Sequence, residues 1–337
     1  MRWKKIRAGQ SLSEANKFMH PGILHTKESL ERMKYYIDHR IEPAYSSYRL
    51  LEADSCALST YQMQGPFEVI ARLGVNKHTK RPSEDDHKAA YLNALMWTLT
   101  GDEAHARKSI EILNAYSAML KLIGPNDNDD PLCASLQGSM LANAAELIKH
   151  TYSKVTPAEI AGWEKMLRTV FIPVLDTFFK AKPYTNGNWG AAATKAYMAF
   201  GIFLEDEALY NQAVHFYYNG HDNGTIKNYI GENGQCQESG RDQDHVMFGL
   251  GNLAEACETA YNQGDEKMYA AFDNRLLTGY EYTAKYNLGE AVPFTTWTDI
   301  SGRYCNWQTI SDKLRGVFRP IYEIVYLSLI HISEPTR

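Results

Sequence analysis

A short polar run at residues 235–245 holds most of the side-chain types that acid–base chemistry needs. It reads Gln-Cys-Gln-Glu-Ser-Gly-Arg-Asp-Gln-Asp-His and leads directly into an apolar pattern with helical spacing. We expect Asp242 or a neighbour to cap this helix and His245 to lie in its first turn. Arg241 would then lie about one turn from His245, so that both side chains can face one ligand. Polar loops that merely cap a helix have a similar composition, and that alternative stays open.

A second candidate is the turn Asn186-Gly187-Asn188-Trp189. An Asn-Gly pair is typical of a tight turn, and Asn188 occupies the position expected for the N-cap of a helix at 191–203. Backbone amides and the dipole at a helix N-terminus favour an anion, and the Asn188 amide adds a donor without adding a charge. We therefore expect Asn188 to hold a carboxylate. The alternative is structural, with Asn188 only a cap and Trp189 only a core residue.

A third loop, at 294–307, combines aromatic faces with a cation and a phenol. Its Trp297, Arg303 and Tyr304 suit sugar rings and carboxylates, because ligand sites combine apolar faces with a few placed polar groups. Exposed aromatic side chains in loops also pack against neighbouring loops, so a purely structural role is the alternative.

The elements that must position these loops are helices, since apolar residues recur at helical spacing and strand alternation is nearly absent. Thr156 followed by Pro157 and Glu159 predicts a capping box, and Thr100-Gly101-Asp102 predicts a tight connection between two helices. Because no repeat of constant length is present, the pattern favours a ring or bundle of antiparallel helical hairpins over a regular solenoid. The expected helices cover residues 30–36, 89–99, 104–120, 136–148, 160–179, 191–203 and 208–218.

Composition and charge exclude several classes of protein. The 337 residues are enough for one large domain or two ordinary ones. The net charge of −5, from 35 basic and 40 acidic residues, argues against nucleic acid or an anionic membrane surface as the main partner. The five cysteines are far apart and odd in number, which indicates neither a disulfide framework nor a zinc site. The sequence contains no apolar run long enough to predict a transmembrane helix.

The two ends of the chain carry expectations of their own. No apolar segment follows the basic start at 1–7, so the sequence as written shows no signal peptide. Residues 328–337 resemble the translation of a sequencing adaptor, and we expect them to be a non-native tail on a truncated domain. The expected organisation is a lead-in at 1–19, one domain at 20–327 and this tail.

Several stretches spread over the chain form a pattern together: His20-Pro-Gly-Ile-Leu-His25-Thr, Tyr91-Leu-Asn-Ala-Leu-Met-Trp97, Asn186-Gly-Asn188-Trp189, Gln237-Glu-Ser-Gly-Arg241-Asp-Gln-Asp-His245, Arg275-Leu-Leu-Thr-Gly-Tyr-Glu-Tyr-Thr-Ala-Lys-Tyr286 and Val292-Pro-Phe294. The pattern resembles the alginate-lyase-like polysaccharide lyases of bacteria, in particular the polyuronate lyase group of gut Bacteroides. This resemblance implies an all-α fold, an incomplete (α/α) toroid or barrel of antiparallel helical hairpins. It also implies an anionic polysaccharide substrate, no cofactor and no metal, and a periplasmic or secreted location.

The resemblance implies β-elimination on a uronic-acid polymer such as alginate or a glucuronan. A base removes the proton at C5, alpha to the carboxylate, while an acid assists departure of O4, and the carboxylate must be neutralised. Asn188 matches the family asparagine and is expected to neutralise the carboxylate. Trp189 stands where relatives carry a histidine, which makes Arg241 or Gln243 the expected second contact.

The same resemblance implies which residues transfer protons. His245 matches a helix position that carries a catalytic tyrosine or histidine in relatives, and an imidazole can accept or donate a proton near neutral pH. Tyr304 is the preferred phenol, over three tyrosines at 280–286 whose helical spacing favours packing. The residues expected to bind substrate are Trp189, Gln237, Glu238, Gln243, Trp297 and Arg303.

Two other functions remain as alternatives. A glycoside hydrolase on a similar helical barrel would use Glu238 with Asp242 or Asp244, although these three carboxylates lie in one short segment and must flank a scissile bond. A helical protein that binds glycans without turnover is the second alternative.

Overall fold

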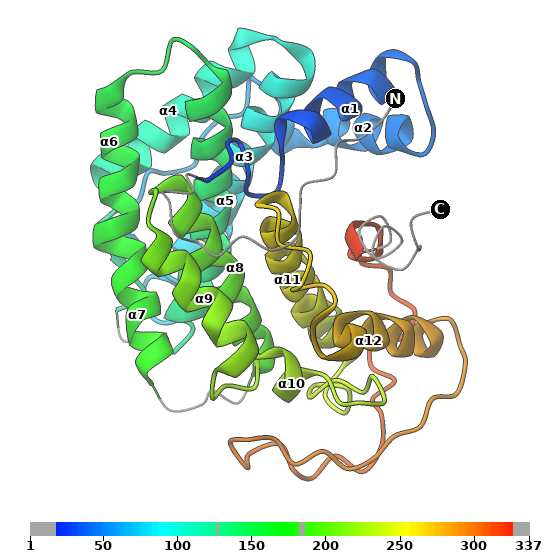
Figure 1. Cartoon of the computed structure of the whole chain (residues 1–337). Helices are drawn as coiled ribbons and strands as arrows, with labels where there is room; N and C mark the ends of the chain where they lie inside the picture. Colours follow the sequence, from blue (N-terminus) through cyan, green and yellow to red (C-terminus); the bar gives the residue numbers. More distant parts are fainter. Residues whose placement is uncertain (1–17, 126–127, 182–185, 326–337) are drawn as a thin grey trace, which may run out of the picture.

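The computed structural model describes residues 18–125, 128–181 and 186–325. The predicted non-native tail at 328–337 and most of the predicted lead-in lie outside these residues. Within them the regular secondary structure is almost entirely helical, with hairpins arranged side by side around an inner group of helices (Figure 1). The predicted all-α toroid of antiparallel helical hairpins is therefore confirmed.

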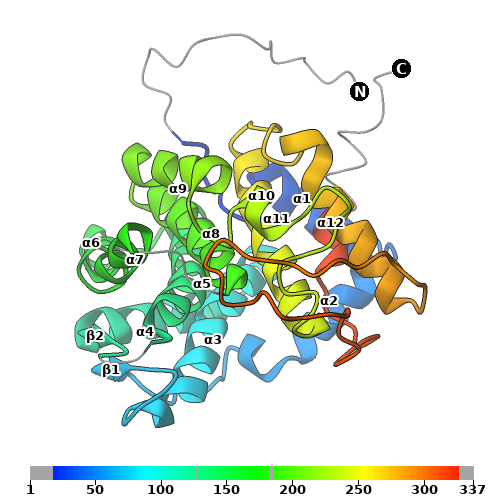
Figure 2. The same ribbon diagram turned by 90° about the horizontal axis from the view of Figure 1, so that it is seen from below.

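Four inner helices form the wall of the central space: α3 (Lys80–Thr100), α5 (Asp130–Thr151), α8 (Gly187–Phe203) and α11 (Gln243–Asn262). Neighbours in this series pack extensively against each other, and Figure 2 shows their ends together. Nearly all of α8 is buried, because small and apolar residues cover its whole circumference. Apolar residues all round a helix predict such an inner position.

The remaining elements surround this group. The outer helices are α4 (Glu103–Met119), α6 (Pro157–Met166), α7 (Ile172–Lys180), α9 (Glu207–Asn219) and α12 (Ala271–Asn287). A π-helical turn, η3 (Leu167–Phe171), joins α6 to α7. Helices α1 (Lys27–Asp38) and α2 (Ala44–Ala53) form a flanking hairpin, and α10 (Ile226–Tyr229) is a single turn before α11. The short elements are η1 (Ser55–Ala57), η2 (Lys77–Thr79) and the parallel strands β1 (Val69–Ile70) and β2 (Leu122–Ile123), with Val69 opposite Leu122.

Local sequence signals account for the hairpins. The Thr156 side chain accepts a hydrogen bond from the Glu159 backbone N–H, and the Glu159 carboxylate accepts one from the Thr156 backbone N–H, so the predicted capping box is confirmed. Gly101 ends α3 with a φ of 74°, and Asp102 caps α4 directly afterwards, which confirms the predicted tight connection. The inner helices consequently run in one direction and their partners return outside them.

The start of α8 differs from the prediction. The helix begins at Gly187, so Asn186 holds the N-cap position and Asn188 lies in the first turn. A β-carbon at Gly187 would meet the Tyr229 ring at 2.4 Å, so only a glycine lets this turn approach that ring. The predicted cap at Asp242 is confirmed, because its carboxylate accepts from the backbone N–H of His245.

Candidate active site

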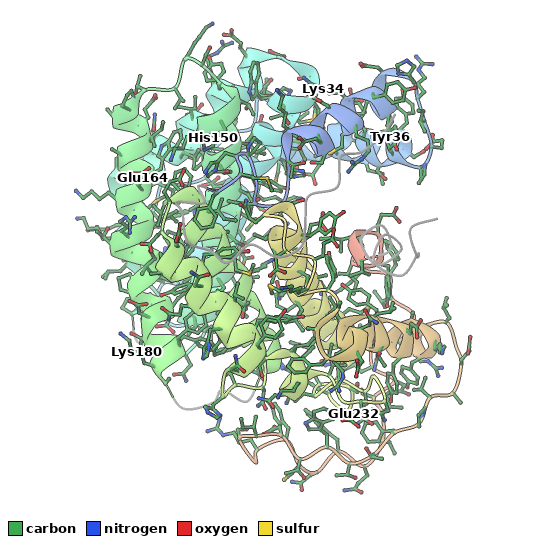
Figure 3. The ribbon with its side chains drawn as sticks, viewed as in Figure 1. Lys34, Tyr36, His150, Glu164, Lys180 and Glu232 are labelled. Atoms are coloured by element: carbon green, nitrogen blue, oxygen red, sulfur yellow. The ribbon has the colours of Figure 1, made fainter. Side chains whose placement is uncertain are left out.

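A pocket of about 1290 Å³ lies between the inner helices. Asn186, Asn188 and Arg241 line it near the N-terminal ends of α8 and α11, whereas Leu24 and His25 line it from the segment that precedes α1. The loop that follows α12 passes over the N-terminal ends of α8 and α11, beside α10 (Figures 1 and 2). Figure 3 marks the two ends of the molecule, with Glu232 on the loop side and His150 near the segment before α1.

The three loops singled out in the sequence meet at one atom, the side-chain oxygen Oδ1 of Asn186. Arg241 donates to it from Nη1 at 3.0 Å, and the Tyr304 hydroxyl donates to it at 3.1 Å. Asn186 itself was not among the predicted site residues. Its position in the Asn-Gly turn is the available signal, since the amide of a turn asparagine often makes local hydrogen bonds.

Asn188 is buried and faces Glu238 of the neighbouring loop. Its amide nitrogen Nδ2 lies 2.8 Å and 3.0 Å from the two Glu238 carboxylate oxygens, and its backbone N–H lies 3.2 Å from one of them. The amide oxygen Oδ1 of Asn188 is buried and has no hydrogen-bond partner among the described residues. The orientation shown therefore directs the amide donors toward Glu238.

Glu238 is a fully buried carboxylate at the centre of this arrangement. Besides Asn188, it accepts from Arg241 Nη1 at 2.8 Å and lies 3.2 Å from the Tyr229 hydroxyl. Burial raises the pKa of Glu238 above its ordinary value, against the opposing effects of Asn188, Arg241 and His245. Glu238 is therefore more easily protonated than an exposed glutamate.

His245 lines the pocket from the first turn of α11 and is oriented by Asp242. Its ring Nδ1 lies 2.8 Å from each Asp242 oxygen. Burial favours a raised pKa for Asp242, but the hydrogen bonds from the backbone and ring of His245 outweigh it and hold that pKa below its usual value. Because the ionised carboxylate accepts only, Nδ1 carries the proton and Nε2 is the free acceptor.

Tyr229 closes the space beside His245. Its hydroxyl lies 3.1 Å from the backbone oxygen of His245, and a β-carbon at Gly249 would come within 2.0 Å of it. Gly249 therefore admits the Tyr229 hydroxyl to the surface of α11. Sequence reasoning missed Tyr229, since a tyrosine in a four-residue helix gives no pattern of its own.

The loop that carries Tyr304 is held by two contacts. Asp299, which is buried, accepts from the Tyr304 backbone N–H at 3.0 Å, and the Tyr304 ring stacks on Trp307 with centroids 4.6 Å apart. A β-carbon at Gly240 would lie 2.4 Å from the Trp307 side chain, so the glycine lets this loop lie against the 235–245 run. The phenol is thereby fixed over the Asn186 turn.

The structure gives other roles to several residues predicted to bind substrate. Gln237 is buried and accepts from the Gly187 backbone, and Gln243 is buried and donates to the Ser311 carbonyl. These glutamines and the buried Glu238 hold loops in place and are not among the residues that line the pocket. Trp189 lines the pocket, whereas Trp297 lies at the Gly231 turn and Arg303 is exposed. Substrate binding by these residues stays a prediction.

Cations line the pocket, and acids accompany them. Arg72 pairs with Glu84 at 2.8 Å, and Lys195 pairs with Glu255 at 2.8 Å deeper along α8 and α11. Arg319 likewise contacts Asp244. The carboxylates of an anionic ligand can replace these acidic side chains as partners of the cations. The pocket therefore suits a chain with several carboxylates.

One group among the described residues has the composition of a metal site. His20, Glu146 and His150 place their ligand atoms within 4.8 Å of one another, and none of them lines the pocket described above. The two rings stack with centroids 4.2 Å apart and planes 8° from parallel, so their nitrogens do not converge on one point. Instead His20 Nδ1 lies 2.7 Å from Glu146, as expected for a hydrogen bond. No described helix is long and apolar enough to cross a membrane.

The helical toroid brings an amide, an arginine, an oriented histidine and a phenol to one end of the pocket, an arrangement that fits a polysaccharide lyase of the toroid class. The model of the alginate lyase family matches residues 64–294, and the chain belongs to this family. The match lies within the predicted domain at 20–327. The comparison with curated proteins gave no match.

Solved structures with the same fold include two groups of alginate lyases. Alginate lyase A1-III from Sphingomonas species A1 is 13% identical, covers 76% of each chain and gives a TM-score of 0.60. A variant of A1-III in complex with a tetrasaccharide is 16% identical over 80% of this chain and 81% of that one, with a TM-score of 0.62. An alginate lyase from Bacteroides ovatus is 15% identical over 78% and 83% of the two chains, with a TM-score of 0.57.

Proposed function

We propose that this lyase cleaves a uronic-acid polymer, alginate or a glucuronan-like chain, by β-elimination. The observation that carries the proposal is the meeting of Arg241 and Tyr304 on Asn186, beside Asn188 and the pocket that His245 lines. A carboxylate binder, a base and an acid are the three groups that the reaction requires. The complex of A1-III with a tetrasaccharide supports a saccharide ligand for this fold.

Each group has one task in this mechanism. Arg241 and Asn188 bind the uronate carboxylate and stabilise the negative charge that grows on it when C5 loses its proton. His245 takes that proton on Nε2, because Asp242 keeps the other ring nitrogen protonated. The electron pair forms the C4–C5 double bond, the C4–O4 bond breaks, and the Tyr304 hydroxyl gives its proton to O4.

The three carboxylates named for the hydrolase alternative are engaged in other contacts. Glu238 is fully buried among Asn188, Arg241 and Tyr229. Asp242 is occupied by His245, and Asp244 by Arg319. A hydrolase needs two carboxyl groups that face a sugar from opposite sides.

The product distinguishes elimination from hydrolysis. Mannuronate-rich alginate, guluronate-rich alginate and glucuronan are incubated with the purified protein, and ultraviolet absorbance is followed with time. Elimination creates a conjugated double bond that absorbs, whereas hydrolysis does not. New reducing ends without a gain in absorbance on any of the three polymers would support the hydrolase and contradict our proposal.

A His245→Ala variant separates a lyase from a non-catalytic glycan-binding protein. Removing a general base or acid is expected to lower kcat by about 10²- to 10⁴-fold. Oligouronate binding, measured by calorimetry, should stay within a few-fold of the unmodified chain, because the carboxylate binders remain. Wild-type binding without turnover would favour the glycan-binding alternative.

We also infer that the enzyme works in the periplasm or outside the cell, where polymers too large to cross a membrane are met. The family and the polymeric substrate support this location. Fractionation of source cells, with an antibody against the protein, tests it, and recovery in the cytoplasmic fraction would contradict it.

A further inference from the structure

We propose that Glu238 is a positioning residue that carries a proton in the substrate complex, where its O–H donates to Asn188 Oδ1 and turns the Asn188 N–H toward the uronate carboxylate. This inference rests on the proposed function and adds a residue that does not itself touch substrate. Its proton is taken up from solvent when substrate binds and is returned on release, so the overall elimination is unchanged.

The starting observation is a mismatch at Asn188. The amide directs Nδ2 at both Glu238 oxygens, at 2.8 Å and 3.0 Å, and leaves the buried Oδ1 without a partner among the described residues. An amide oxygen and a uronate carboxylate are both acceptors, so this orientation cannot bind the carboxylate. A half-turn of the amide exchanges its oxygen and nitrogen with almost no change of shape.

The turned amide requires a proton on Glu238. With Oδ1 toward an ionised carboxylate, two acceptors would face each other in a buried site, which costs free energy. A carboxylic acid removes this conflict because its O–H can donate to Oδ1. The amide donors are then directed toward the pocket that Asn188 lines.

The surroundings of Glu238 allow this change. Burial opposes the ionised form of Glu238, whereas Asn188, Arg241 and His245 favour it. Burial and the charge of Glu238 raise the pKa of the neighbouring Cys236 and Tyr229, so both stay neutral. The Tyr229 hydroxyl also lies 3.1 Å and 3.2 Å from the carbonyls of His245 and Val246, so it has acceptors besides Glu238. Protonation therefore leaves the phenol satisfied.

An incoming carboxylate shifts the balance further. Arg241 donates to Glu238 at 2.8 Å, and while Glu238 is ionised the pair is neutral overall. A uronate that draws the guanidinium toward itself weakens the interaction that keeps Glu238 ionised. Once Glu238 is neutral, the full positive charge of Arg241 acts on the substrate carboxylate, where charge develops during proton abstraction.

The pH dependence of KM tests the proposal. In the unmodified enzyme, KM should rise about tenfold per pH unit above the pKa of Glu238 in the free enzyme, because one proton is bound with the substrate. Glu238→Gln presents a permanent N–H donor to Asn188 Oδ1, so its KM should lose this dependence. Glu146→Gln removes another buried carboxylate, outside the pocket, and should keep the wild-type dependence.

Proton uptake gives a second measurement that needs no turnover. A Tyr304→Phe enzyme is titrated with a tetrauronate by calorimetry, in buffers that differ in ionisation enthalpy. Above the pKa of Glu238, we expect uptake of about one proton per site, and addition of Glu238→Gln should reduce it to near zero.

Two results would overturn the role of Glu238. One is an unchanged dependence of KM on pH in a folded, active Glu238→Gln enzyme; the other is no proton uptake by Tyr304→Phe. Either result leaves the proposed function intact if the wild type forms unsaturated uronate. Absence of that product with the wild type on every polyuronate is instead a failure of the proposed function.

Discussion

The ring Nδ1 of His245 lies 2.8 Å from both carboxylate oxygens of Asp242, and the same carboxylate accepts from the His245 backbone N–H at 2.8 Å. One side chain thus begins helix α11 and selects the tautomer of the residue that we propose as the base. The two tasks can be separated by substitution, since asparagine is also a good N-cap but can donate to Nδ1.

Asp242→Asn should therefore lose rate with a smaller loss of stability than Asp242→Ala, because it keeps the cap. Its amide can donate to Nδ1 and move the ring proton to Nε2, which leaves no base toward the pocket, so we expect kcat to fall about 10²- to 10⁴-fold. Asp242→Ala should in addition lower the free energy of unfolding by about 0.5–2 kcal/mol through loss of the cap. Steady-state kinetics and chemical denaturation measure the two effects. Equal loss of stability in both variants would contradict the separation of capping from orientation of the His245 ring.

The same carboxylate makes a pH-dependent contribution to stability. Its pKa is lowered by folding, so the contribution is present above the pKa of the unfolded chain and is lost as pH falls through the folded pKa. Asp242→Asn should remove this part of the acid sensitivity, visible as a smaller fall in Tm between neutral and acid pH.

Tyr304 and Tyr280 form a matched pair for testing the phenol. Tyr304→Phe removes the hydroxyl that donates to Asn186, and we expect a loss of kcat of about 10²- to 10⁴-fold with substrate binding retained. The Tyr280 hydroxyl is buried and has no hydrogen-bond partner among the described residues, so Tyr280→Phe should leave kcat unchanged and Tm unchanged or raised. Full activity of Tyr304→Phe would show that the Tyr304 hydroxyl is not the acid of the mechanism.

Arg241→Gln should weaken both substrate binding and the fold. KM should rise because the charged carboxylate contact is lost, and the buried Glu238 carboxylate loses its cation at a cost of about 3 kcal/mol at neutral pH. Folding already raises the pKa of Glu238, so protonation at lower pH stabilises the folded chain, and the penalty should shrink there. Denaturation at several pH values tests this; a penalty that grows on acidification would contradict it.

His20 provides a separate prediction about the segment before α1. Burial favours a lower pKa for His20, but the carboxylates of Glu146 and Glu205, each 2.7 Å from one ring nitrogen, outweigh it and raise that pKa. The resulting stabilisation is present below the unfolded pKa and is lost as pH rises through the folded pKa. The protection of residues 19–26 against hydrogen exchange, relative to the unfolded chain, should fall over that range. In His20→Phe this protection should be low at all pH values. Faster wild-type exchange on acidification would contradict the assignment.

Much of this architecture follows from the sequence because helices are local structures. Apolar spacing, the Thr156 capping box and the Asp242 cap act over a few residues, and the helices predicted from them are present. Helix α2, in contrast, was not predicted, and none of its residues is buried. The family resemblance supplied the ring arrangement.

Tertiary structure decided how the polar side chains divide their tasks. Glu238 and Gln243 are as polar in sequence as Arg241 and His245, yet packing buries the first pair and leaves the second on the pocket. Asn186 accepts hydrogen bonds from two loops that are distant in the sequence, because the fold places their donors beside it. Hydrogen bonds of this kind join residues more than 50 positions apart, and no short-range pattern specifies them. The sequence determined which chemical groups each loop offers, and the packing of loops across the helix ends determined which groups face a substrate.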